Sequence, residues 1–217
     1  MKWVGYLQVF LTMIGWAAGL FGVVYAVNGA TQAPAFVTVP VTLAAVPERG
    51  GAVHVQVEGV SVREGWLTGA VPSGAWTTVG GQPGPDSQLR LTAWGSTRME
   101  QLLARGSWLV GGLGVMVGAF ALAPVLGSIA EGRPFAPGNA RRVVVLGATV
   151  AIAGWLAQLL PQVAGALVLR RTGLAGPAFV SAPSGALEPL LVGAVILAVA
   201  AAFRAGERMA DELAGLV

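Results

Sequence analysis

The stretch that organises this chain is Glu131-Gly132-Arg133-Pro134-Phe135-Ala136-Pro137-Gly138-Asn139-Ala140-Arg141-Arg142. It is short and polar, it contains three arginines, and it separates two long apolar runs. Arginines in a short loop favour the inner side of a membrane, so this loop predicts how the chain is threaded. Pro134 and Pro137 end one helix, and Asn139 is a good N-cap for the next.

The composition is that of a chain whose solvent is lipid. Of its 217 residues, 55% are hydrophobic and only 11% are charged, whereas a soluble domain has roughly 25% charged residues. The net charge is +3, but the arginines are scattered, so we expect no direct binding to nucleic acid. The chain has no cysteine, which excludes disulfides, thiolate catalysis and Cys-ligated metals.

The first apolar run, from Trp3 to Val27, is long enough to cross a bilayer, which takes roughly 20 residues. A cleaved signal peptide is the alternative, because Lys2 supplies a positive start. The run is longer than a signal core and 27–30 is a poor cleavage site, so we expect a retained anchor. Aromatic residues that favour the membrane interface lie towards the ends of the run: Trp3, Tyr6 and Tyr25.

Between residues 31 and 96 the hydrophobic pattern becomes alternating. The runs 37–43, 53–62 and 89–93 alternate apolar with polar residues, which is typical of half-buried strands. Pro40 cannot donate to a ladder, so we expect its strand at a sheet edge. The first and last strands each feed a neighbouring helix, so we expect them to lie close together in a small antiparallel sheet.

Helix signals complete the fold prediction. Thr97 and Glu100 fit a capping box, and Pro189 suits the first position of the last span. The predicted class is an integral membrane, mainly α protein with four transmembrane helices and a small antiparallel β-sheet domain inserted between helices 1 and 2. Its segments are transmembrane helix 1 at 1–30, a β-rich extracytoplasmic insertion at 31–96, transmembrane helix 2 at 97–130, a cytoplasmic loop at 131–142, transmembrane helix 3 at 143–170, an extracytoplasmic loop at 171–188, and transmembrane helix 4 with a cytoplasmic tail at 189–217.

Small residues recur in three spans at a spacing that favours close helix packing. In a chain with 32 glycines such matches also arise by chance. The positions are Gly15 and Gly19, Gly114 and Gly118, and Ala194, Ala198 and Ala202.

Charge then gives the orientation. With the amino terminus inside, the short segments 1–4, 131–142 and 203–217 are cytoplasmic and hold six basic residues. The outer pair Arg170 and Arg171 opposes this assignment. The abundance of Gly, Ala and Arg suggests a GC-rich bacterium. We therefore predict a multi-pass protein of a bacterial inner (plasma) membrane with both termini in the cytoplasm.

Two short motifs resemble a known family. The segments 132–135 and 139–142 resemble a Pro-Phe…Asn-x-x-Arg loop, and 203–217 resembles the end of the same sequences, although Ala214-Gly215 departs from their acidic residue and threonine. The family is that of the bacterial membrane proteins catalogued as domain of unknown function 2975. The resemblance covers the carboxyl-terminal half and implies an inner-membrane protein with no known activity, with a small helix-turn-helix regulator as a candidate partner.

No catalytic, cofactor-binding or metal-ligating residue is predicted. The one histidine, His54, lies on the polar face of a predicted strand, and one histidine does not make a zinc site. None of the spans has a charged residue or a histidine at its middle, which argues against a pump or an ion-coupled carrier. We therefore expect a protein that is not an enzyme and has no cofactor.

Two functions stay open. The first is a partner-binding, sensory or complex-stabilising module that contacts membrane lipid and either another protein or a second copy of the chain. The second is a binder or exporter of a small lipophilic molecule, with Gln158 and Gln162 lining a polar cavity between the helices. Alternatively, these glutamines only satisfy backbone groups freed by Pro161.

The basic loop and the acidic tail are expected to associate, because they carry opposite charges on the same side of the membrane. Phe135 and Phe203 would supply apolar contact beneath the charges. A cytoplasmic docking face is one interpretation, and two solvated ends is the other. The residues of the predicted docking face are Arg133, Phe135, Asn139, Arg141, Arg142, Glu207, Asp211 and Glu212.

Overall fold

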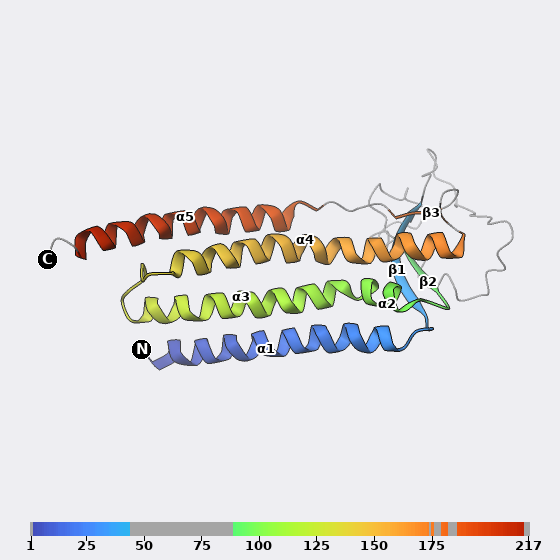
Figure 1. Cartoon of the computed structure of the whole chain (residues 1–217), viewed down its shortest axis with the longest axis horizontal. Coiled ribbons are helices and arrows are strands. Elements are labelled where there is room, and N and C mark those ends of the chain that lie inside the picture. The colour runs from blue at the N-terminus through green and yellow to red at the C-terminus, as the bar shows by residue number, and fades with distance from the viewer. Residues whose placement is uncertain (1, 44–88, 174, 176–178, 182–185, 215–217) are drawn as a thin grey trace, which may run out of the picture. The chain divides into compact units, whose positions relative to one another are not determined.

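The computed structural model describes the whole chain except residues 1, 44–88, 174, 176–178, 182–185 and 215–217 (Figure 1). Two compact units divide the chain, one formed by 1–25, 108–157 and 185–217 and the other by 26–107 and 158–184. The helices and strands are α1 (Lys2–Thr31), β1 (Val37–Leu43), β2 (Leu89–Ala93), α2 (Arg98–Ala104), α3 (Gly106–Ala130), α4 (Asn139–Thr172), β3 (Phe179–Val180) and α5 (Glu188–Ala214).

Four of the helices, α1, α3, α4 and α5, are long and apolar enough to cross a membrane. Two antiparallel strands, β1 and β2, lie between the first two of them in the sequence. This confirms the coarse prediction of a mainly helical chain with four candidate membrane spans and strands after the first one. The predicted second span, 97–130, consists of two helices, since a turn at Arg105 separates α2 from α3.

In the first unit, glycines set the distance between α1 and α3, which lie side by side (Figure 1). A Cβ built on Gly15 would lie 2.9 Å from that of Ala119, and one on Gly22 would lie 2.5 Å from the carbonyl oxygen of Trp108. Contacts advance along α1 while they recede along α3, so the two helices are antiparallel. Gly15 and Gly19 therefore pack where the sequence predicted, and any side chain larger than hydrogen would separate the helices.

Helix α4 packs between α3 and α5 in the same way. Gly114 faces Ala153, and Gly193 of α5 approaches the carbonyl oxygen of Gly147, at 2.8 Å from a Cβ built on it. An apolar cluster of Val125, Val143 and Ala200 joins α3, α4 and α5. The predicted packing stripe of α5 is wrong, because the stripe is exposed and Gly193 and Ala200 face the bundle instead. The exposed alanines are Ala194, Ala198 and Ala202.

Polar contacts place three chain segments at one end of this unit. Gln8, one of the few polar residues of α1, donates from Nε2 to the carbonyl of Ala123 near the end of α3. The 131–138 loop follows α3 directly, and the last turns of α5 contact that loop through Phe203. The start of α1, the loop and the end of α5 thus lie together (Figure 1).

The second unit contains the sheet, whose strand order is β2-β1-β3. Strand β1 pairs with β2 from Val37↔Ala93 to Val41↔Leu89, which confirms the strands predicted at 37–43 and 89–93. The edge position predicted from Pro40 is wrong, since β1 is the middle strand. Pro40 has a strand neighbour on one side only, because it pairs with Arg90 of β2 while β3 pairs only with Thr42 and Leu43. The predicted strand at 53–62 and His54 lie outside the described residues.

The sheet buries one face against the last turns of α4. Its core consists of the inward side chains of β1 and β2 and three residues of α4, packed together and almost fully buried. Alternation along each strand explains this face, because every second residue points to the same side. These core residues are Val37, Val39, Val41, Leu91, Ala93, Ala164, Val168 and Leu169.

Candidate functional site

The 131–142 loop and the last turns of α5 form a contact in the first unit that we call the loop–tail junction. The rings of Phe135 and Phe203 lie edge to face, with centroids 5.8 Å apart. Gly206 is buried beneath the Phe135 ring, so closely that a Cβ there would collide with it. The predicted apolar contact between the loop and the tail is therefore present.

A carboxylate closes the junction. Glu207 accepts a hydrogen bond through Oε1 from the backbone amide of Ala140, at 2.8 Å. The amide belongs to the first turn of α4, where backbone donors have no partner within the helix and the helix dipole is positive. Glu207 thus acts as a cap for a helix 67 residues away in the sequence.

The buried side chain of Asn139 forms hydrogen bonds that stabilise the loop. Its side chain is fully buried and donates through Nδ2 to the carbonyl of Pro134, at 3.0 Å, and to the hydroxyl of Ser128. Its Oδ1 accepts from Nη1 of Arg142, at 3.2 Å. The predicted N-cap position of Asn139 is wrong, because Asn139 is the first residue of α4, and its side chain instead joins the end of α3, the loop and a loop arginine.

The charges of the junction are arranged differently from the prediction. Arg133 pairs with Glu131 in the same loop, and Glu207 takes a backbone amide in place of an arginine. Arg141 and Glu212 are both exposed. The side chain of Asp211 lies outside the described residues. The junction therefore rests on one carboxylate–amide bond, one buried asparagine and one pair of rings.

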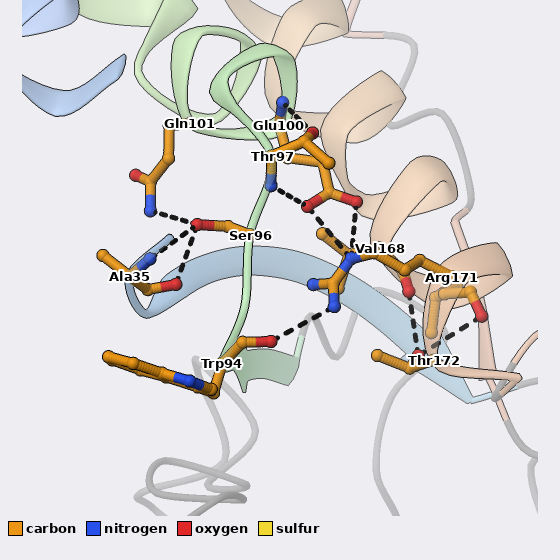
Figure 2. Close-up of polar contacts among 10 residues, drawn as sticks. Ala35, Trp94, Ser96, Thr97, Glu100, Gln101, Val168, Arg171 and Thr172 are labelled. Atoms are coloured by element: carbon orange, nitrogen blue, oxygen red, sulfur yellow. Dashed lines mark hydrogen bonds and ion pairs between the residues drawn. The ribbon is translucent and has the colours of Figure 1, made fainter. Parts of the chain in front are cut away.

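A second polar site, which the sequence did not predict, lies in the second unit (Figure 2). Glu100 is only 3% exposed and accepts from Nε of Arg171 at 2.9 and 3.1 Å. The same arginine donates through Nη1 to the carbonyl of Trp94, at 3.1 Å. Glu100 also completes the predicted capping box with Thr97. The carboxylate therefore caps α2 and holds the last turn of α4.

Gln101 extends this site beneath the sheet. It is 1% exposed and donates through Nε2 to the carbonyl of Phe36 and to the hydroxyl of Ser96. Its Oε1 accepts from Arg105, and the Ser96 hydroxyl donates to the carbonyl of Ala35 at 2.7 Å. We call these linked residues the capping network. Such a buried polar network fixes one arrangement because each of its groups has a partner.

The sequence predicted the capping box of the capping network but not its ion pair. The spacing of Thr97 and Glu100 predicted the capping box, but Arg171 is 71 residues from Glu100. From the sequence, Arg171 is only a charge that opposes the predicted orientation. Because its partner is a buried carboxylate, most of that charge is neutralised locally.

The predicted cavity residues do not line either of two apolar hollows in the described part of the first unit. Two apolar hollows occur in the first unit, one between α3 and α4 and the other between α1, α3 and α4. Neither is lined by Gln158 or Gln162. Both glutamines are half-buried in the second unit, where the carbonyl of Gln162 accepts from the hydroxyl of Ser181 at 2.6 Å. A polar cavity beside them stays a prediction.

Within the described residues, no group of three or more His, Asp or Glu side chains is placed to hold a metal ion. Comparison with known proteins adds no functional assignment. No protein-family model, curated protein or solved structure matches the chain. The family resemblance of the loop and the tail therefore stays a prediction.

Proposed function

We propose that this chain is a non-enzymatic protein of a bacterial inner membrane that binds another protein through its loop–tail junction. The observation that carries the proposal is the bond from the Ala140 amide to Glu207. It ties the end of α5 to the start of α4, so two distant segments present one continuous surface. A surface made of two tethered segments suits a partner that must recognise the assembled bundle.

The exposed residues around the junction have the character of a docking surface. Phe135 is 44% exposed and Met209 is 59% exposed, which leaves apolar surface beside charges. Arg141, Arg208 and Glu212 are exposed nearby in the loop and the tail. Apolar and arginine side chains together are typical of protein interfaces. By the family resemblance, the candidate partner is a small helix-turn-helix regulator in the cytoplasm.

The threading of the chain supports a cytoplasmic junction. The start of α1, the 131–142 loop and the end of α5 lie at one end of the first unit, and all three carry basic residues. The main count against this orientation was the pair Arg170 and Arg171. Arg171 is paired with Glu100, but acidic partners have little influence on this rule, so both arginines still count against the orientation that the basic residues of the short inner segments favour.

Site-specific photo-crosslinking tests the proposal in living bacteria. A benzoylphenylalanine at Met209 is expected to give a discrete protein adduct, whereas one at Val195 is the matched control. Both positions are exposed residues of α5, but Val195 lies in the apolar candidate span, where we expect it to face lipid. Reversal of charge at Arg141 and Arg142 is expected to weaken the Met209 adduct.

Two results would contradict the proposal. One is an equal yield of the same protein adduct from benzoylphenylalanine at Met209 and at Val195. The capture would then not be specific to the loop–tail junction. The other is partner binding that is unchanged after residues 209–217 are removed, with the truncated chain still folded by circular dichroism.

A further inference from the structure

We propose that the hollow between α1, α3 and α4 binds one acyl chain of a membrane phospholipid. This site is separate from the loop–tail junction and does not depend on it. The hollow has a volume of about 360 Å³, within the range of about 300–1,000 Å³ for small-molecule sites. We call it the acyl groove, and its walls include Leu11, Ile14, Gly111, Val115, Gly118 and Ala153.

The chemistry of the walls selects hydrocarbon. Thr149 is the one polar side chain among the residues that line the groove, and the rest are apolar or glycine. A ligand with polar groups along its length would leave them without partners, which costs free energy in a dry site. The three helices are long and apolar enough to be membrane spans, so we expect lipid to be the medium that reaches the groove.

The shape of the groove favours a thin occupant. Along α4 it extends from Leu146 to Ala157, which is about 17 Å at the helical rise of 1.5 Å per residue. A single hydrocarbon chain is much thinner than a helix, which is about 10–12 Å across with its side chains. A helix from a second copy of the chain would pack on the groove with one face only, and the experiment below distinguishes that occupant from a lipid.

One end of the groove has residues that suit a lipid headgroup. Phe21, Tyr25 and Trp108 form an aromatic cluster, with ring centroids 5.7–5.9 Å apart. Phe21 follows the wall residue Ile14 by seven positions, and Trp108 precedes Gly111 by three, so the cluster continues the same helix faces. Tyr and Trp rings favour the headgroup level of a bilayer. The headgroup would lie at this cluster and the chain would run along the glycines.

Gly111 offers a direct way to fill the groove. Gly111 is a wall residue of the groove and a Cβ built on it meets no atom within 4 Å, so we expect a larger side chain there to take up part of the hollow. Gly5 provides a matched control, since a Cβ built on it also meets nothing within 4 Å and it is not part of the groove wall. Both glycines lie inside helices of the first unit.

The experiment measures lipid that stays bound after extraction. Full-length protein in phosphatidylcholine nanodiscs is transferred to detergent and examined by native mass spectrometry. The original chain and Gly5→Leu are expected to keep one phospholipid, and Gly111→Leu is expected to lose it. If Gly111→Leu fails the circular dichroism and gel-filtration checks, Val115→Phe narrows the groove from a wall residue that is 48% exposed.

A photoreactive lipid identifies the location. Phosphatidylcholine with a diazirine in the middle of one acyl chain is expected to label α3 and α4 at the groove after detergent transfer. Equal lipid retention in Gly111→Leu and Gly5→Leu would overturn the proposal. Two results with the folded original protein would also overturn it: retention of no lipid, and retention of a second copy of the chain in place of a lipid. An unchanged Met209 crosslink in Gly111→Leu would show that the docking face is unaffected.

Discussion

Two glutamates each cap the start of a helix, and their surroundings differ. Glu100 caps its own helix α2, is almost fully buried, and is paired with Arg171. Glu207 is half-buried and caps α4 from a distance of 67 residues in the sequence. Among the described residues, no basic side chain forms an ion pair with Glu207.

This difference separates a structural site from a candidate docking site. A buried carboxylate without a cation is costly, so Glu100 and Arg171 must stay together for the capping network to persist. A half-buried carboxylate on a single amide can exchange that partner for water at little cost. The capping network therefore fixes the fold, while the loop–tail junction is able to reorganise when a partner binds.

The largest effect is expected at the capping network. Arg171→Met would leave Glu100 buried without its cation and is expected to lower the free energy of unfolding by on the order of 3 kcal/mol. Denaturant unfolding in detergent micelles measures the change. Arg170→Met is the control, because Arg170 is exposed and next in sequence. Equal effects of the two substitutions would contradict the assigned role of the ion pair.

Gln101→Ala is expected to have a smaller effect. It removes the donor to Phe36 and Ser96 from a buried site, and a buried group without its partner costs about 1–3 kcal/mol. Gln32→Ala changes the same side chain at an exposed position and should leave the unfolding midpoint unchanged. A stability loss no greater than that of the control would show that the network is not needed.

At the loop–tail junction we expect a mainly local effect. Glu207→Ala removes a helix cap, which typically costs about 1 kcal/mol. Hydrogen–deuterium exchange should become faster in the peptide that contains Ala140 and stay unchanged in peptides from the sheet. Glu212→Ala is the control because Glu212 is an exposed acidic residue of the same tail. Unchanged exchange at Ala140 would contradict the cap.

The smallest effect is expected at Arg133. Its ion pair with Glu131 is exposed on both sides, and exposed pairs contribute about 0–1 kcal/mol. Arg133→Ala should therefore leave the unfolding midpoint within error of the original chain. A clear loss of stability would mean that the loop has a structural role that the junction contacts do not explain.

The sequence predicted the features that depend on local patterns. The four apolar runs, the strands at β1 and β2, and the capping box of Thr97 and Glu100 each have a period or a spacing that physics explains. The pairing of Glu100 with Arg171 has no local pattern, because the two residues meet only when the sheet packs on α4.

The sequence also did not predict which face of a helix packs in the bundle, because small residues occur on every face. In α5, alanines recur every four residues on the exposed side, while the contact with α4 uses Gly193 and Ala200. Hydrophobicity does not distinguish the two faces, because lipid and the bundle interior are both apolar. The turn at Arg105 was missed for a related reason, since the helical pattern continues through it.

Cysteine accessibility tests the central claim, that the loop–tail junction is cytoplasmic, most directly. The chain has no native cysteine, and Pro137 is an exposed loop position, whereas Gly138 has a φ of +91° that a cysteine would strain. Single cysteines at Pro137 and Met209 are expected to resist an impermeant maleimide in intact cells and to react after permeabilisation, while one at Gln32 reacts in both. Labelling of Pro137→Cys or Met209→Cys from outside intact cells would contradict the account.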